Sequence, residues 1–113
     1  MSTISTHILD TSRGRPASGV AVTLEALNGE AWSVLARAET DQDGRVKASA
    51  LSQTQLEAST YRLTFEIGKY FQALNQPSFY PEVSVSFRIE GGAEHYHVPL
   101  LVSPFGYSTY RGS

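Results

Sequence analysis

The chain contains no cysteine among its 113 residues. This absence excludes a disulfide scaffold, a cysteine-ligated zinc site and a thiol nucleophile, and it fits a reducing compartment. The sequence also lacks any run of about 18 apolar residues, the length that a membrane-spanning helix needs. Its first residues show no basic region followed by an apolar one, as a secretory signal would. We therefore expect a cytoplasmic protein without a membrane span.

Excess charge of either sign is also missing, since the formal net charge is −2. Without a basic excess, nucleic acid and anionic membranes are not expected partners. The length suits one domain, and a domain of this size buries roughly two-thirds of its unfolded surface. No internal repeat, linker or low-complexity segment interrupts the sequence. We predict a single domain over residues 1–113.

Apolar residues at every second position are the main pattern that is present. Alternation predicts strands over 3–10, 20–26, 32–38, 45–49, 61–67, 83–89, 94–102 and 105–111. Glycine, proline, asparagine and aspartate mark turns between them. Residues 51–59 are polar and predict a loop, whereas 68–75 has the apolar spacing of a short helix. Many short strands separated by turns indicate an antiparallel β-sandwich.

The last predicted hairpin, which turns at Ser103-Pro104, has one unusual face. Side chains alternate along a strand, so Tyr96 and Val98 belong to an apolar core face together with Leu100 and Val102. The opposite face combines His95 and His97 with Pro99 and Leu101. A half-apolar outer face suggests a surface covered by another copy of the chain. The alternative is an edge strand with solvated histidines.

Histidines are the residues best suited to chemistry here. His7 shares its strand face with Leu9, so it has the same mixed surroundings as His97. Histidine titrates near neutral pH and can act as a general base or acid. Burial at an interface would lower its pKa and keep it neutral. The alternatives are structural or solvated histidines, or a zinc site formed by His7, His95 and His97.

Other motifs are weaker. Arg45 follows an Asp-Gly turn and could hold a planar substrate, although a solvated charge at a strand end is the simpler interpretation. Asp41–Gly44 begins like a calcium loop, but its twelfth position is Ser52 rather than glutamate. There is no Gly-x-Ser-x-Gly elbow for acyl-enzyme chemistry. Tyr110 has small neighbours on its strand face, which leave room for a ligand or reflect a frayed terminus.

Three motifs resemble the 5-hydroxyisourate hydrolases, also called transthyretin-related proteins. The first is Ser5-Thr-His-Ile-Leu-Asp10, followed by Arg13-Gly-Arg-Pro16 and Val20-Ala-Val22. The second is Asp43-Gly-Arg45. The third runs from His95 to the closing Tyr-Arg-Gly-Ser113, an ending that the hormone-carrying transthyretins lack. The order and spacing of these motifs agree with the family along the whole chain.

The resemblance implies a transthyretin-like sandwich of two four-stranded sheets with one short helix. It also implies a homotetramer, a dimer of dimers, with active sites in a channel at the dimer–dimer contact. The implied reaction is hydrolysis of 5-hydroxyisourate to 2-oxo-4-hydroxy-4-carboxy-5-ureidoimidazoline in urate breakdown, without metal or cofactor. The implied catalytic residues are His7, Arg45 and His97, but not His95. The implied substrate-binding residues are His7, Arg45, Tyr110, Arg111 and Ser113.

Two other functions stay open. The same channel could carry a small molecule, as in transthyretin, although two histidines, an arginine and a tyrosine make a polar lining for an apolar aromatic ligand. The domain could also be a structural module of a larger assembly. The mechanism that we expect has His7 and His97 flanking a water, with Arg45 stabilising negative charge. Tyr110 would contact the planar ring, and the carboxylate of Ser113 would orient Arg111 or a histidine.

Overall fold

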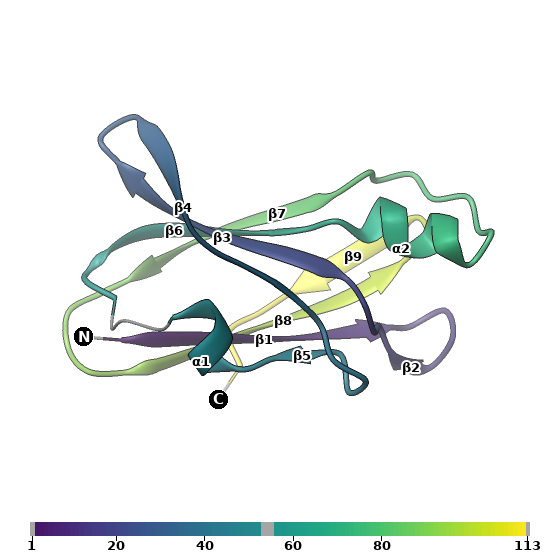
Figure 1. Cartoon of the computed structure of the whole chain (residues 1–113), viewed down its shortest axis with the longest axis horizontal. Helices are drawn as coiled ribbons and strands as arrows, with labels where there is room; N and C mark the ends of the chain where they lie inside the picture. Colours follow the sequence, from purple (N-terminus) through teal and green to yellow (C-terminus); the bar gives the residue numbers. More distant parts are fainter. Residues whose placement is uncertain (1, 53–55, 113) are drawn as a thin grey trace.

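The computed structural model describes residues 2–52 and 56–112. Two β-sheets pack face to face, and two short helices lie beside them (Figure 1). The first sheet contains β1 (Thr3–Asp10), β2 (Arg15–Pro16), β5 (Arg45–Val46), β8 (His95–Ser103) and β9 (Gly106–Thr109). The second contains β3 (Ala21–Asn28), β4 (Ala31–Glu39), β6 (Ser59–Phe65) and β7 (Val83–Ile89). The predicted β-sandwich is confirmed.

The strand order places β1 and β8 in the middle of the first sheet, in the order β2-β1-β8-β9, and β5 also pairs with β1. Including β5, this sheet has five strands rather than the four predicted. The β1–β8 pair is parallel, whereas the sequence predicted antiparallel strands throughout. The other pairs of neighbouring strands within residues 2–52 and 56–112 run antiparallel. The second sheet has the order β4-β3-β6-β7.

The core lies between the sheets and follows the predicted alternation. On β1, Ile4 and Ile8 are fully buried, and on β8 Leu100 and Val102 are too. Their partners from the second sheet are also buried: Val22, Leu24, Leu63, Phe65 and Val83. Full burial of one such aliphatic side chain contributes roughly 1.5–3 kcal/mol. The core therefore fixes which face of β1 and β8 is left for the outer surface.

The described residues form two helices where one was predicted. The helix α2 (Ile67–Ala73) confirms the short helix expected near 68–75, and it buries Ile67 and Phe71. The additional helix α1 (Ala48–Leu51) replaces the end of the predicted strand 45–49 and the start of the predicted loop. Leu51 is 2% exposed. Burial of this leucine favours a helical turn that the local alternation did not indicate.

Short side-chain contacts tie these helices to β1. The hydroxyl of Ser52, directly after α1, accepts a hydrogen bond from the Ile4 amide at 3.1 Å. At the other end of β1, the Tyr70 hydroxyl of α2 donates to the buried Asp10 carboxylate at 2.8 Å. Within residues 2–52 and 56–112, no helix is long and apolar enough to cross a membrane. β1 is thus held at both ends, with its middle presented on the outer face.

Candidate active site

The outer face of β1 carries the first predicted site residue. Residues alternate along this strand between buried and half-buried, and His7 is among the half-buried ones. Its neighbours on the same face include Ser5 and Leu9. The buried face holds Ile4 and Ile8, so a shift of one residue would move these side chains out of the core. Core packing therefore fixes the direction of the His7 side chain.

Strands on either side of β1 bring two further residues to this face. Arg45 of β5 is the antiparallel partner of His7. On β8, His97 is the parallel partner of Ser5, and Pro99 is the partner of His7. Paired residues project from the same side of a sheet. His7, Arg45 and His97 therefore lie on one face, from three adjoining strands, as the sequence predicted.

A tight turn positions Arg45. The Asp41 carboxylate accepts hydrogen bonds from the amides of Asp43 at 2.9 Å and Arg45 at 3.0 Å. The bond from the Arg45 amide is the main reason why the pKa of Asp41 lies below its ordinary value. Gly44 adopts a φ of 75°, and its carbonyl oxygen accepts the Ile8 amide at 2.7 Å. The Asp-x-Asp-Gly motif thus folds as a turn that fastens Arg45 beside β1.

The His97 ring has a defined environment. Its Nδ1 lies 2.8 Å from the Ser5 hydroxyl oxygen. Burial lowers the pKa of His97 below 6.5, and the nearby charges of His7, His95 and Arg45 lower it further. A backbone hydrogen bond with Ser5 acts weakly in the opposite direction. At neutral pH the ring is therefore neutral, which is the form that a general base requires.

His95 belongs to the same group of side chains, although the family resemblance implied no catalytic role for it. Its Nε2 lies 2.9 Å from the Ser5 hydroxyl and its Nδ1 lies 2.7 Å from the Thr3 hydroxyl. Ser5 and Thr3 were not predicted as site residues. The signal that could have found them is the polar alternation of residues 3, 5 and 7. This pattern identifies site residues only when the parallel pairing of β1 with β8 is known, because that pairing sets Thr3 opposite His95 and Ser5 opposite His97.

The end of the chain returns to His97. The Gly112 amide donates a hydrogen bond to the His97 carbonyl at 2.8 Å. A Cβ atom on residue 112 would come within 2.7 Å of the His97 ring and 3.3 Å of Pro99. Glycine is therefore required by this close approach, which explains one residue of the closing motif. Ser113, predicted to bind substrate, lies outside the described residues.

Tyr110 and Arg111, the other two predicted residues of the tail, have surroundings different from those of Gly112. The Arg111 guanidinium stacks on the Tyr96 ring at 4.5 Å and lies 3.4 Å from the Glu94 carboxylate. Tyr96 belongs to the buried face of β8, so Arg111 is directed away from the histidine face. Tyr110 is 57% exposed and lines a cavity of about 160 Å³ between β7 and the end of the chain. Within residues 2–52 and 56–112, no hydrogen bond, ion pair or ring contact joins Tyr110 or Arg111 to His7 or Arg45.

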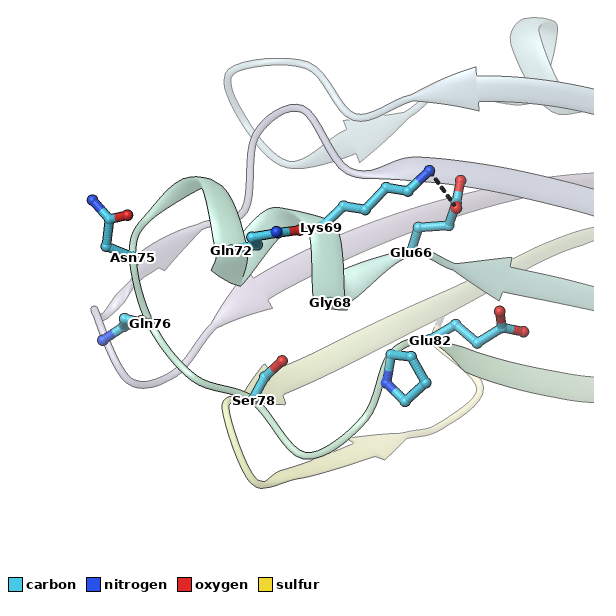
Figure 2. Close-up of a pocket in the computed structure, with 9 residues that line it drawn as sticks. Glu66, Gly68, Lys69, Gln72, Asn75, Gln76, Ser78 and Glu82 are labelled. Carbon is cyan, nitrogen blue, oxygen red and sulfur yellow. Dashed lines mark ion pairs between the residues drawn. The ribbon is translucent and has the colours of Figure 1, made fainter.

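A larger cavity lies elsewhere, between α2 and the segment before β7 (Figure 2). It measures about 640 Å³, and its side chains are polar, including an ion pair of 3.2 Å between Lys69 and Glu66. Asn75 and Gln76 lie at one end of this cavity, and Glu82 lies at the other. It contains no histidine or arginine. Neither this cavity nor the one beside Tyr110 is lined by His7, Arg45 or His97.

The histidines do not form the alternative metal site considered from the sequence. Among residues 2–52 and 56–112, no three histidine, aspartate or glutamate side chains come together in a geometry that could hold a metal ion. His95 instead uses both ring nitrogens in hydrogen bonds to hydroxyls. The arrangement can therefore provide proton transfer and anion binding from its own side chains.

Comparison with known proteins shows the family to which this chain belongs. The family model described as "HIUase/Transthyretin family" matches residues 4–112. The chain belongs to the HIUase/transthyretin family. Within this family, a 5-hydroxyisourate hydrolase of Salmonella dublin is 47% identical over 110 residues, which cover 97% of this chain and 80% of that protein. The resemblance read from the three motifs is confirmed.

Solved structures of the same family share the fold. The 5-hydroxyisourate hydrolase of Klebsiella pneumoniae matches with a TM-score of 0.88 and 43% identity over the whole of both chains. Sea bream transthyretin in complex with thyroxine matches with a TM-score of 0.91 and 28% identity, covering 97% of this chain and 94% of that one. The transthyretin-like fold is confirmed. Because a hydrolase and a thyroxine-binding protein share it, side chains must distinguish the two functions.

Proposed function

We propose that this protein hydrolyses 5-hydroxyisourate, an intermediate of urate breakdown. The observation that carries the proposal is the placement of His7, Arg45 and His97 on one face by three adjoining strands. Support also comes from relatives named 5-hydroxyisourate hydrolase at 42–47% identity over nearly the whole chain. A neutral histidine beside a second histidine and an arginine is suited to the addition of water to an activated carbonyl.

The reaction opens the six-membered ring of the substrate. The oxygen of water bonds to the ring amide carbonyl, and the carbon–nitrogen bond then breaks. One water proton ends on the released nitrogen, and the other leaves from the new carboxylic acid. The product is 2-oxo-4-hydroxy-4-carboxy-5-ureidoimidazoline. Positioning and proton transfer carry the catalysis, and the chain's own side chains supply both.

Each residue of the face has a role in this mechanism. His97 removes a proton from water, because burial and neighbouring positive charges keep its ring neutral. His7 lies across the substrate position and holds the water or the leaving nitrogen. Arg45, which is exposed and fixed at the start of β5, binds the carbonyl oxygens and stabilises the developing negative charge. Tyr110 contacts the planar ring of the substrate from the tail, and Ser113 also takes part in substrate binding.

Arg111 takes part through the tail in this proposal. Its guanidinium is engaged by Tyr96 and Glu94, so it anchors the residues around Gly112. An exposed ion pair contributes little to stability, about 0–1 kcal/mol, but it restricts where the tail can lie. Arg111 would therefore support substrate binding by holding the closing motif against His97.

A homotetramer would complete the site. The outer face of β1 and β8 combines half-buried His7 and His97 with Leu9 and Leu101. A second copy packed over this face would exclude water and make the face one wall of a channel. Native mass spectrometry tests the assembly, and the proposal expects four chains. Cell fractionation tests the proposed cytoplasmic location.

The rival function is a carrier of small molecules, which the sea bream transthyretin fold favours. A carrier should bind thyroxine and leave 5-hydroxyisourate unchanged. The deciding assay follows the ultraviolet absorbance of freshly prepared 5-hydroxyisourate with and without the protein. The hydrolase proposal expects faster decay of the substrate, and binding of thyroxine without any acceleration would favour the carrier.

Single substitutions test the residue roles. His7→Asn, Arg45→Ala and His97→Gln should each lower kcat/KM by roughly 10²–10⁴. Arg37→Ala is a matched control for Arg45→Ala, because Arg37 is an exposed arginine of β4 in the other sheet. If the three variants accelerate decay as well as the unmodified protein does, the assignment of the site is wrong.

A further inference from the structure

Four side chains on the outer face of β1 and β8 form a continuous path. The Thr3 hydroxyl lies 2.7 Å from Nδ1 of His95, and Nε2 of His95 lies 2.9 Å from the Ser5 hydroxyl. The same hydroxyl lies 2.8 Å from Nδ1 of His97. Each distance is within the range of a hydrogen bond. The path runs from Thr3 through His95 and Ser5 to His97, whose ring faces the proposed reaction.

The chemistry of these groups allows the path to run in two directions. A hydroxyl donates one hydrogen bond and accepts others, and a neutral imidazole has one donor and one acceptor nitrogen. In the first direction, His97 donates from Nδ1 to Ser5, and Ser5 donates to His95, so Nε2 of His97 is a free base. In the second, His95 donates to Ser5 and Ser5 donates to His97, so Nε2 of His97 carries a proton and is an acid.

We propose that Ser5 and His95 are positioning residues that form a proton relay and set the tautomer of His97. This inference rests on the proposed hydrolysis, in which His97 must first accept a proton and later donate one. The relay would change His97 from base to acid without rotating its ring. Thr3 completes the relay by holding the second nitrogen of His95.

Proton transfer balances at each step. Nε2 of His97 takes a proton from water, and the Nδ1 proton of His97 moves to the Ser5 oxygen. The original Ser5 proton moves to Nε2 of His95, which becomes the cation. When Nε2 of His97 later gives its proton to the leaving nitrogen, the same protons return through Ser5. No net proton is gained or lost by the three residues in a full cycle.

The groups around His97 disfavour a positive charge on its ring, which explains why a relay would help. His7 on β1, Arg45 on β5 and His95 on β8 all disfavour a positive charge on the ring. The tail contributes the neutral Gly112 beside the ring, while Arg111 is paired with Glu94. A charged His97 would therefore be costly in this position. Moving the positive charge to His95, which pairs with Thr3 at the start of β1, takes it away from Arg45, which pairs with His7.

Three variants and one control distinguish a relay from simple packing. Ser5→Ala removes the bridging hydroxyl, and Ser5→Thr restores a hydroxyl at the same position. His95→Gln keeps hydrogen-bonding groups next to Ser5 but cannot take up a proton. Ser33→Ala is the matched control, because Ser33 is a strand serine with a single side-chain partner, Asn28, in the other sheet.

The kinetic experiment measures kcat and KM with 5-hydroxyisourate across pH. We expect Ser5→Ala and His95→Gln to lower kcat by about tenfold or more with little change in KM, since only proton transfer is affected. Ser5→Thr should recover most of the loss, and added imidazole should raise the rate of His95→Gln. If both Ser5→Ala and His95→Gln keep the kcat of the unmodified protein, the relay is wrong.

A second readout needs no activity. Nitrogen-15 NMR of the imidazole rings reports which nitrogen of His97 carries the proton. The relay predicts that the tautomer populations of His97 change in Ser5→Ala and in His95→Gln, but not in Ser33→Ala. Unchanged His97 signals in both variants would overturn the relay even if hydrolysis is confirmed. Absence of hydrolysis in the unmodified protein would instead contradict the proposed function, while the NMR result still tests the hydrogen-bonded path.

Discussion

The Gly112 amide donates to the His97 carbonyl at 2.8 Å, and Gly112 leaves no room for a side chain beside the His97 ring. A Cβ at this position would lie 2.7 Å from Cδ2 of His97. The Tyr-Arg-Gly-Ser motif therefore has a structural role. It packs against a predicted catalytic ring and fixes that ring from the side opposite Ser5.

Gly112→Ala should displace the His97 ring and lower kcat/KM by about tenfold or more, because small displacements of reacting groups are costly. Gly91→Ala is the control, since Gly91 has nothing within 4 Å of the added Cβ and no left-handed φ. Steady-state kinetics and thermal unfolding should be measured for both. Equal activity of the two variants would show that the tail contact does not position His97.

The turn before Arg45 gives a second prediction. Gly44 has a φ of 75°, and an added Cβ would lie 2.5 Å from the Ile8 carbonyl oxygen. Gly14 has a similar φ of 66° but open space around it. The left-handed conformation costs a residue with a side chain roughly 1–2 kcal/mol in both places. The clash with Ile8 should add about 1–3 kcal/mol at residue 44 alone.

Urea unfolding of Gly44→Ala and Gly14→Ala measures this difference directly. We expect Gly44→Ala to have the lower free energy of unfolding and also the lower activity, because the turn carries Arg45 next to His7. If Gly14→Ala is destabilised as much as Gly44→Ala, the close approach of Gly44 to β1 contributes nothing.

Much of this site follows from strand alternation. The burial of Ile4 and Ile8 could be predicted from the sequence, and with it the outward direction of His7. The parallel pairing of β1 with β8 could not, because it joins segments 92 positions apart, such as Ser5 and His97. For this reason the role of Ser5 was missed, although both residues lie in recognised motifs.

Other differences between the predicted and the observed structure also have local causes. The helix α1 exists because Leu51 fits the core and the Ser52 hydroxyl receives the Ile4 amide, and neither contact is visible in a polar stretch of sequence. Arg111 was expected at the substrate. In the folded chain, its guanidinium contacts the Tyr96 ring and the Glu94 carboxylate, and its role at the substrate stays a proposal. Register and alternation place a side chain on a face, but its final contacts depend on neighbours from distant segments.

The depressed pKa of His97 predicts the acid side of the pH profile. Burial and the charges of His7, His95 and Arg45 place this pKa below 6.5, so the ring stays neutral until the pH falls below that value. The proposed base is therefore active at neutral pH. We expect kcat/KM to decline only as the pH falls below about 6.5, after subtraction of the uncatalysed decay.

The free energy of unfolding should also depend on the protonation of His97. Because the folded pKa lies below the unfolded one, the unfolded chain takes up the proton first as the pH falls. The protein should then lose stability as the pH falls from the unfolded pKa to the folded pKa of His97. His97→Gln should remove this part of the pH dependence. A profile of thermal unfolding that is identical in both proteins would contradict the shift.

The most direct test of the central claim is a crystal structure of the protein with a non-hydrolysable purine analogue. Our account predicts the analogue on the outer face of β1 and β8, in contact with His7, Arg45 and His97, and covered by a second copy of the chain. An analogue bound instead in the cavity beside α2, with the histidine face empty, would contradict it.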